Sequence, residues 1–360
     1  MTTLESTPTT TPESADPDEV ADRVVGILND GAICLLASIG HELGIFETLS
    51  ALPPATSTQV ADAAGLDERY VREWLGGMVT AGFVEYVPAD GTYYLCPDHA
   101  PFLTGTGPDN LARTMRFISL MGQVQPKVAE VFRNGGGLSY DDYPGFHHLQ
   151  AGDSAAVNDA SLLDTILPLA GVTDRLEQGI AVADIGCGEG HAINLMARAF
   201  PRSTFVGYDF SAEAVTTARE EAAAWGLANA RFEELDVARL AEESAYDLVT
   251  TFDAIHDQAH PATVLANIRR AIRPDGRYLM VDIKASSNLE DNLDLPWASF
   301  LYAVSTVHCM SVSLGQGGDG LGTVWGVQAA ERMLREAGFS DVVVHDLEAD
   351  PFNAYFVARP

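Results

Sequence analysis

The sequence predicts an α/β protein: a doubly wound, mostly parallel sheet with an antiparallel last strand, preceded by a smaller helical domain. Three features of the chain lead to this prediction. Short β-branched runs alternate with helical segments from residue 180 onward. A glycine-rich turn joins the first of these runs to a helix. Residues 20–106 instead combine helical spacing with one hairpin signal, which indicates a separate domain.

The glycine-rich turn lies in residues 182–190, Val-Ala-Asp-Ile-Gly-Cys-Gly-Glu-Gly, at the end of an apolar run. Glycine is needed where a Cβ would block a tight turn or the close approach of the backbone to a ligand. The helix after the turn presents free N–H groups to a polar or anionic ligand. A dinucleotide-binding turn would have its third glycine at position 191, where this chain has His191. The pattern here is instead Asp184 followed by three glycines two residues apart: Gly186, Gly188 and Gly190.

Acidic residues also end the strands that follow. Asp209 stands nineteen residues after Gly190, where an acid is placed to accept hydrogen bonds from ribose hydroxyls. Residues 341–347 and 354–358 are expected to form an antiparallel pair that closes the sheet. Helical segments at 212–225 and 261–272 separate the intervening strands. Those strands are expected at residues 204–209, 230–237, 246–253 and 272–282.

This order of motifs resembles the class I S-adenosylmethionine-dependent methyltransferases, whose sheet is Rossmann-like. The resemblance implies S-adenosyl-L-methionine as the cofactor, with Asp184 facing the amino group of the donor and Asp236 meeting its adenine. A generic α/β domain, whose acids only cap strands and helices, is the alternative. The cofactor-binding residues implied by the resemblance are Asp184, Gly186, Cys187, Gly188, Gly190, Asp209, Phe210, Asp236, Val237, Phe252, Asp253, Tyr143 and His147.

Length and composition set the broad class of the protein. The 360 residues can hold two domains, and no apolar run reaches the ~20 residues of a membrane span. Residues 1–19 lack the basic and apolar regions of a signal peptide and are expected to be a disordered tail. The four cysteines are scattered and are expected to be reduced, free of metal and unbridged. We therefore expect a cytoplasmic protein without a membrane partner.

The charge balance is strongly acidic. Fifty-one Asp and Glu face twenty-one Lys and Arg, for a net charge of −30, and only Lys127 and Lys284 are lysines. Self-repulsion of this size destabilises a compact state unless salt screens it. The composition therefore suggests a salt-loaded, halophilic cytoplasm, with an acidic actinobacterial protein as the alternative. It argues against binding to a phosphate backbone, which needs clustered Lys and Arg.

The N-terminal domain, residues 20–106, reads as a winged helix. Short helices at 57–65 and 67–82 precede a hairpin around an Asp90-Gly91 turn. Such a domain could read DNA, or it could serve dimerisation and substrate capping as in small-molecule O-methyltransferases. Residues 1–106 carry three arginines, no lysine and sixteen acids, so we expect no nucleic-acid partner. The resemblance to small-molecule O-methyltransferases implies a homodimer instead.

Two further segments are expected to shape the acceptor site. Residues 107–175 form a helical connector and lid, with an aromatic and histidine-rich loop at 140–148 that either covers the methionine end of the donor or is an ordinary surface turn. The C-terminal domain, 176–360, contains an insertion at 285–325 rich in aromatic residues and methionine. Placed over the ligand-binding edge of the sheet, that insertion would suit a flat apolar substrate, though a core or dimer contact explains it almost as well.

The predicted catalytic residue is His256. It follows the fourth strand of the sheet, and a phenol acceptor with a pKa near ~10 needs a base to take its proton. Asp257 completes a His-Asp pair that resembles the one in plant and bacterial O-methyltransferases, where the histidine is the general base. The tryptophan that often follows is Gln258 here.

Several alternatives to this assignment stay open. His256 could be hydrogen-bonded loop structure only, or His147 or His308 could be the base. His256 and His260 have the spacing of two metal ligands on a helix, but Pro261 favours a helix start, so no metal is expected. The function expected is methyl transfer to a small, mostly apolar acceptor. Its rivals are a ligand-sensing transcriptional regulator and a same-fold enzyme that binds the donor without transferring methyl.

Overall fold

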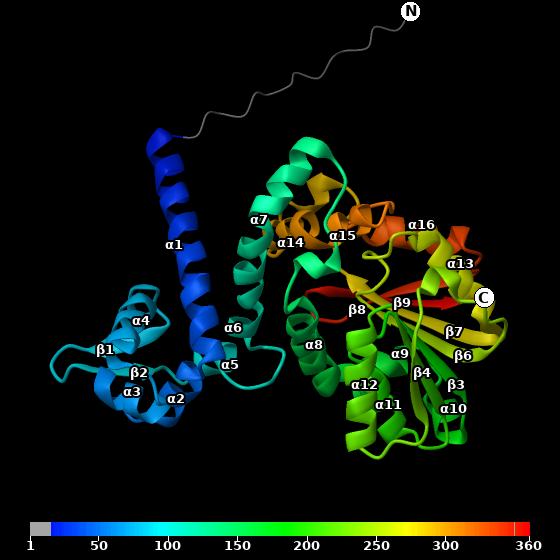
Figure 1. Ribbon diagram of the computed structural model, residues 1–360, viewed down its shortest axis with the longest axis horizontal. Coiled ribbons are helices and arrows are strands. Elements are labelled where there is room, and N and C mark those ends of the chain that lie inside the picture. The colour runs from blue at the N-terminus through cyan, green and yellow to red at the C-terminus, as the bar shows by residue number, and fades with distance from the viewer. Residues whose placement is uncertain (1–15, 349) are drawn as a thin grey trace, which may run out of the picture. The chain divides into compact units, whose positions relative to one another are not determined.

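The computed structural model describes residues 16–348 and 350–360, and the chain divides into two compact units (Figure 1). One unit comprises residues up to 104 together with 111–118, and the other comprises 105–110 and 119–360. Most of the predicted tail lies outside the described residues. Its last three residues contradict the prediction, because helix α1 (Pro17–Glu42) already begins there. The cause is local: the Asp16 side chain accepts a hydrogen bond from the Asp18 N–H and caps the helix.

The first unit is a bundle of short helices with a two-stranded wing. Its helices pack around Trp74, whose ring meets Phe46 edge-on at 5.0 Å and whose Nε1 donates to the Leu36 carbonyl at 2.7 Å. Thr56 and Asp67 cap the two helices of the helix-turn-helix with their side-chain oxygens. The elements after α1 are α2 (Ile45–Ala51), α3 (Ser57–Ala64), α4 (Glu68–Thr80), β1 (Val84–Val87), β2 (Thr92–Leu95), α5 (Ala100–Leu103) and α6 (Leu111–Thr114).

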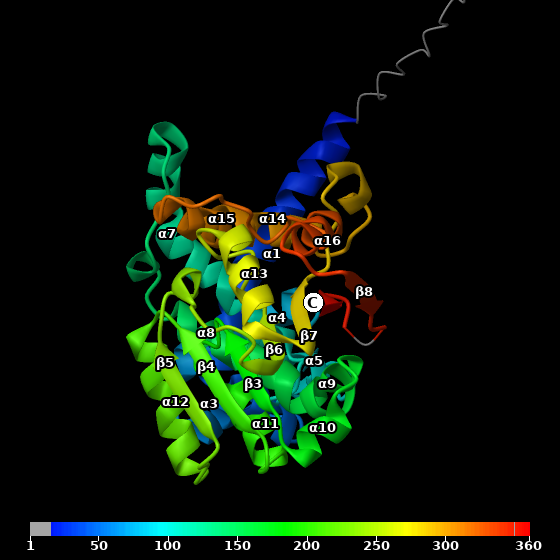
Figure 2. The same cartoon turned by 90° about the vertical axis from the view of Figure 1, so that its right-hand side faces the viewer.

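The second unit is built on one seven-stranded sheet in the order β5-β4-β3-β6-β7-β9-β8 (Figure 2). The strands β3 to β7 pair in parallel, and β9 runs antiparallel to both of its neighbours, β7 and β8. The predicted fold class is confirmed. The strands are β3 (Ala181–Ile185), β4 (Thr204–Asp209), β5 (Ala230–Glu234), β6 (Tyr246–Phe252), β7 (Ile272–Ile283), β8 (Asp341–Asp346) and β9 (Asn353–Arg359).

Helices cover both faces of this sheet and bury two apolar cores. One core contains α13 (Pro261–Ala271) and α16 (Val327–Glu336), and the other contains α10 (Thr173–Gln178), α11 (His191–Ala199) and α12 (Ala212–Ala224). The strand order reverses between β3 and β6. The loops that leave these two strands therefore flank the crevice where open α/β sheets bind ligands.

The lid segment is more helical than the sequence predicts. The expected helix at 111–133 is divided into α6 and α7 (Arg116–Asn134). The prediction of a loop at 140–148 is wrong for the second half of that segment. It contains a 3-10 turn, η1 (Tyr140–Asp142), and Gly145 at φ +81° then starts α8 (Phe146–Val157), so His147 lies in a helix. A π-helical stretch, η2 (Asn158–Ile166), and α9 (Leu167–Leu169) follow it.

The insertion after β7 is a run of short helices and a glycine-rich loop, as expected. It contains η4 (Leu289–Asn292), α14 (Ala298–Val304), the π-helical η5 (Ser305–Cys309) and α15 (Met310–Gly315). Two glycines fix how it packs, because a Cβ on Gly315 would lie 2.2 Å from the Leu138 carbonyl oxygen and one on Gly318 would lie 2.4 Å from the Ala259 Cα. The insertion thus contacts the lid on one side and the loop after β6 on the other.

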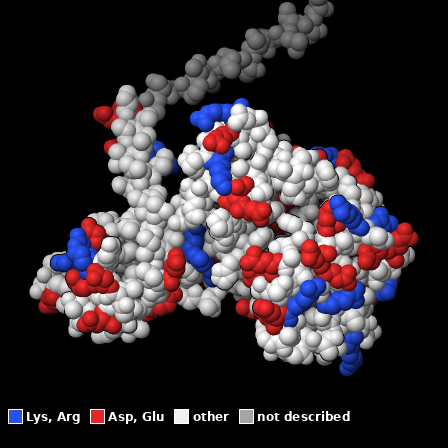
Figure 3. Space-filling view, viewed as in Figure 1, with Lys and Arg blue, Asp and Glu red and all other residues white. Residues whose placement is uncertain are grey.

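The surface reflects the acidic composition. On the face in Figure 3, acidic side chains form scattered patches on a mostly uncharged surface, with basic side chains beside several of them. Both lysines are paired, Lys127 with Asp142 and Lys284 with Asp346, each at 2.6 Å.

Candidate active site

The glycine turn after β3 holds all three of its glycines in the left-handed region, at φ values of +73°, +53° and +74°. The Gly186 and Cys187 N–H groups donate to the Tyr208 carbonyl at 2.8 and 3.0 Å, which fastens the turn to β4. A Cβ on Gly190 would lie 2.5 Å from the Phe232 ring, whereas a Cβ on Gly188 would meet nothing within 4 Å. Gly190 therefore serves packing, and Gly188 leaves open space beside the backbone.

Two buried carboxylates flank this turn. Asp209, at the end of β4, accepts hydrogen bonds from the N–H groups of Gly188 and Ser211, both at 2.9 Å. Asp184, in β3, accepts a hydrogen bond from Thr250 Oγ1 at 2.7 Å. Burial raises the pKa of both groups, that of Asp184 to about 7. Both would gain from a cationic or hydrogen-bond-donating ligand.

The other predicted cofactor residues spread along the carboxyl ends of β4, β5 and β6. Phe210 is 46 % exposed, and Asp236 uses its side chain to cap the 3-10 turn η3 (Val237–Arg239), in which Val237 is buried. Cys187 is a free thiol whose pKa burial holds well above its usual value. Asp253, next to Phe252, has φ +50°, which is strained for a residue with a Cβ. Its side chain lies in the interior, and burial raises its pKa to about 7.

His256 is the centre of the second part of the site. It is buried in the loop after β6, and its Nδ1 lies 2.8 Å from Asp282 Oδ1. The same carboxylate oxygen accepts a hydrogen bond from Trp325 Nε1 at 3.0 Å. His256 Nε2 faces Asp257, with its Oδ1 at 3.4 Å. Because Asp282 and Trp325 fix the ring, Nε2 is the nitrogen that remains for chemistry.

The charge state of His256 is set by its neighbours. Burial alone opposes a positive charge on the ring, but the carboxylates of Asp282 and Asp257 together raise its pKa well above the usual value. A histidine with a raised pKa is a stronger base toward a weakly acidic hydroxyl, but near neutral pH it must lose its own proton before it can act as that base.

Three aromatic side chains of the lid pack against His308 of the insertion. Its ring stacks on Phe146 at 3.6 Å and meets the edges of Tyr143 and Tyr140 at 4.8 and 5.5 Å. Burial lowers the pKa of His308 to about 4, so this histidine is neutral and is a poor base. Neither of its ring nitrogens has a hydrogen-bond partner among the described residues.

The structure thus brings together most of the residues that the sequence singles out on the lid side. His147 stacks on Tyr140 at 5.3 Å, and Tyr140 in turn contacts Phe210. Burial and the charge of Asp257 together raise the pKa of Tyr140 well above its usual value. Tyr143 instead donates to the Val307 carbonyl at 2.5 Å, which ties the lid to the insertion. Sequence reasoning missed Asp282, Trp325, Tyr140, Phe146 and Cys309. An acid ending the strand next to β6 was the available signal for Asp282.

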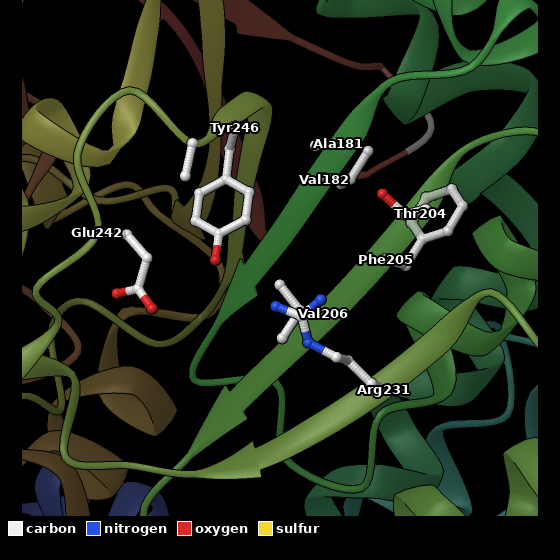
Figure 4. A pocket seen from close by; sticks show the side chains of 9 residues that line it. Ala181, Val182, Thr204, Phe205, Val206, Arg231, Glu242 and Tyr246 are labelled. Carbon is white, nitrogen blue, oxygen red and sulfur yellow. The ribbon is translucent and has the colours of Figure 1, made fainter.

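A surface pocket elsewhere in the second unit is unrelated to this site. It lies where β3, β4 and β6 begin, at the opposite edge of the sheet from the glycine turn (Figure 4). Its polar lining residues are Thr204, Arg231, Glu242 and Tyr246. Open α/β sheets bind their ligands at the carboxyl ends of the strands, so the pocket does not compete with the site around His256.

Comparison with known proteins agrees with the division of the chain into an N-terminal and a C-terminal domain. Residues 31–105 match the family profile of the Rv2258c-like winged helix-turn-helix domain, and residues 176–338 match a methyltransferase domain profile. The ubiquinone biosynthesis O-methyltransferase of Paracidovorax citrulli is 33 % identical over 101 residues, which cover 28 % of this chain and 42 % of that protein. The chain thus matches about two-fifths of the length of this curated relative.

Solved structures resemble nearly the whole chain. An O-methyltransferase candidate from Nostoc punctiforme has a TM-score of 0.72 at 19 % identity, covering 97 % of this chain and all of the other. Human N-acetylserotonin methyltransferase, solved in complex with S-adenosylmethionine, has a TM-score of 0.66 at 17 % identity, covering 97 % and 99 % of the two chains. The protein is therefore a two-domain α/β protein of the methyltransferase fold. Its particular arrangement is an N-terminal Rv2258c-like winged helix followed by a methyltransferase domain.

Proposed function

We propose that this protein is an S-adenosylmethionine-dependent methyltransferase of the cytoplasm that methylates a small, largely apolar acceptor, most simply on a hydroxyl group. The observation that carries the proposal is the position of His256. It stands at the end of β6, across the strand-order reversal from the glycine turn, with Asp282 holding its Nδ1 at 2.8 Å. A proton acceptor and a donor-binding turn thus share one crevice inside a methyltransferase domain.

The residues around the glycine turn suit the donor. The open space at Gly188 admits a ligand close to the backbone. Asp184 and Asp209 are buried carboxylates without a Lys or Arg partner among the described residues, and they would hold the amino group and the ribose hydroxyls. Phe210, Asp236 and Val237 follow the ends of β4 and β5 and would hold the adenine.

Methyl transfer is an in-line displacement. S-adenosylmethionine, when bound, supplies a methyl group on a positively charged sulfur. The acceptor oxygen forms the new bond to carbon as the carbon–sulfur bond breaks, and the sulfur leaves as a neutral thioether. His256 Nε2 takes the hydroxyl proton, and Asp282 stabilises the imidazolium that results. The lid and the insertion align the acceptor and keep water out.

The acceptor class follows from the residues beside His256. The rings of Tyr140, Tyr143, Phe146 and His308 form one continuous cluster, and His308 is neutral. A planar, weakly polar molecule fits such surroundings better than a charged one. A hydroxyl on that molecule would point toward His256 Nε2.

Two measurements test this function. Calorimetric titration of S-adenosylhomocysteine in molar KCl should show binding that Asp209→Ala abolishes, with NAD silent. His256→Gln should keep that binding and lower turnover by about 10²–10⁴-fold, because a general base contributes that much. Wild-type turnover in His256→Gln would make the base assignment wrong. Donor binding without methyl turnover on any acceptor would favour the same-fold enzyme that does not transfer methyl.

We also propose that the protein is a homodimer that pairs through α1. This helix exposes large apolar side chains along much of its length, and Leu43 just after its end is exposed too: Val20, Val24, Val25, Ile27, Leu28, Leu35, Ile39 and Leu43. A second copy of the helix would cover them. Helices Pro17–Glu42 and Ala298–Gly315 both have the length and apolar composition of a membrane span. The second of these helices contains His308 and its neighbours and is part of the candidate active site, so α1 is the helix to test. Light scattering should give a dimer that Leu28→Glu converts to monomer, and vesicle flotation of the wild type would favour a membrane instead.

A regulator that reads DNA is the weaker second function. Its recognition helix would be α4, where Arg69 and Arg72 are both engaged by glutamates, in Arg69–Glu73 and Arg72–Glu68 pairs. Such a helix offers little net positive charge to phosphates. Duplex binding that weakens steeply with salt would support the regulator.

A further inference from the structure

A cluster of three different donor atoms lies at the buried end of the crevice. His256 Nε2, Asp257 Oδ1 and Cys309 Sγ all lie within 4.8 Å of one another. His256 and Cys309 are almost fully buried, with 3 % and 4 % of their surface exposed. The Asp257 Oδ1 atom is buried too and has no hydrogen-bond partner among the described residues. His256 Nε2 lies 3.4 Å from this oxygen, longer than a usual hydrogen bond, so an ion bound between the two side chains would satisfy both atoms.

We infer that these three side chains form a binding site for one divalent ion of borderline-soft chemistry, Zn²⁺ or its substitute Co²⁺. The donor set of one imidazole, one thiolate and one carboxylate is the kind that Zn²⁺ takes. Ligand bonds of about 2.0–2.3 Å in a tetrahedron place the ligand atoms about 3.4–3.8 Å apart. His256 Nε2 and Asp257 Oδ1 are already 3.4 Å apart, and Cys309 Sγ lies within 4.8 Å of both.

The surroundings orient His256 as they do in protein metal sites. A metal-bound histidine usually gives its other N–H to a carboxylate, which fixes the ring and makes the ligand nitrogen more basic. Asp282 fills that role on Nδ1, and Trp325 Nε1 in turn holds the same Asp282 oxygen at 3.0 Å. Nε2 is therefore the ring nitrogen that faces Asp257 and Cys309, and it would give up its proton when it binds the ion.

Coordination has a chemical consequence. The Cys309 thiol loses its proton to solvent when its sulfur binds the ion, and three protein ligands leave a fourth position for water or an acceptor oxygen. The ligand nitrogen of His256 is the same Nε2 that the proposed methyl transfer uses as base. Metal binding and base catalysis by His256 therefore exclude each other, so Zn²⁺ should inhibit methyl transfer. Binding of the ion itself does not depend on the proposed function.

The test is a Co²⁺ titration of the full chain after chelator treatment, followed by visible absorption. We expect one equivalent to bind, with the intense d–d bands of a tetrahedral ion and a sulfur-to-cobalt charge-transfer band. Cys309→Ser should remove the charge-transfer band and weaken binding at least about tenfold. Cys34→Ser, a free and partly exposed cysteine in the first unit, is the matched control and should change nothing. Asp257→Asn serves as a second variant, expected to weaken binding while keeping the sulfur band.

Either of two results overturns the site: a folded wild type that takes up no stoichiometric Co²⁺, or a charge-transfer band that persists in Cys309→Ser. Circular dichroism establishes the fold of each variant, and Asp257→Asn carries the test if Cys309→Ser does not fold. Titration with S-adenosylhomocysteine on the same samples separates the two proposals. Donor binding without Co²⁺ uptake contradicts the metal site alone, and Co²⁺ uptake without donor binding contradicts the methyltransferase function alone.

Discussion

Two glycines of the turn after β3 have the same backbone conformation but different neighbours, which allows packing and ligand contact to be separated. Gly188 and Gly190 have φ values of +53° and +74°. Alanine at either position therefore bears a similar left-handed backbone cost of about 1–2 kcal/mol. Only at Gly190 would the new methyl group strike the core, 2.5 Å from Phe232 Cε1 and 2.6 Å from Ala218 Cβ. Overpacking of this kind adds about 1–3 kcal/mol.

The expected stabilities follow from these terms. Gly188→Ala should lower the free energy of unfolding by about 1–2 kcal/mol, and Gly190→Ala by about 2–5 kcal/mol. For donor binding we expect the opposite order, with Gly188→Ala weakening the binding more than Gly190→Ala. The Gly188→Ala methyl group enters the space that the turn leaves for a ligand, so the S-adenosylhomocysteine Kd should rise by about tenfold or more, equivalent to ~1.4 kcal/mol.

Urea denaturation followed by circular dichroism, and calorimetric titration of the folded fraction, measure the two quantities. Both are run in molar KCl so that surface repulsion is screened equally in each variant. Equal loss of stability in the two variants would refute the packing argument for Gly190. Wild-type affinity in Gly188→Ala would refute the close approach of a ligand to this turn.

Three further outcomes follow from buried or surface charge. With a pKa of about 7, Asp184 is protonated below neutrality and ionised above it. The affinity of the protein for the cationic amino end of the donor should therefore fall about tenfold from pH 8 to pH 6. Asp184→Asn should remove this pH dependence of the affinity. Asp247 is buried and accepts hydrogen bonds from Arg175 at 2.7 Å and from Arg273. Because both arginines are partly exposed, we expect Asp247→Asn to lower the free energy of unfolding in urea by about 2–4 kcal/mol. A decrease below about 0.5 kcal/mol would contradict this expectation. The net charge of −30 should make the melting temperature rise from about 0.05 to 1 M KCl, and no rise would argue against salt adaptation.

The sheet could be predicted from the sequence because its signals are local. Each parallel strand is a short apolar run buried on both faces, and each is followed by a helix with its own periodicity. The spacing from Gly190 to Asp209 then places two strand ends side by side, because consecutive parallel strands pair in this fold. The boundaries of β4 match the prediction, and those of β6 and β9 differ by one residue or two.

The residues that complete the site could not be predicted in the same way. Asp282 and Trp325 reach His256 only through the pairing of β7 with β6 and the return of the chain before α16. These contacts join positions 26 and 43 residues apart, and no periodicity encodes them. The lid illustrates the same limit at short range. The sequence assigns Tyr140 and Phe146 to a loop. In the structure, Gly145 starts a helix that places the Phe146 ring against His308.

The carboxyl edge of the sheet holds more negative charge than its own residues can balance. Asp184, Asp209, Asp253, Asp257 and Asp282 all lie there, and no described hydrogen bond or ion pair joins any of them to Lys or Arg. Burial raises the pKa of Asp184 and Asp253 to about 7, and for Asp253 the nearby charge of Asp282 adds to the rise. An edge of this kind favours a ligand that carries positive charge, and it disfavours a nucleotide with a pyrophosphate. The same imbalance explains why a metal ion beside His256 and a cationic donor beside Asp184 are both consistent with this fold, and why both should bind with release of protons near neutral pH.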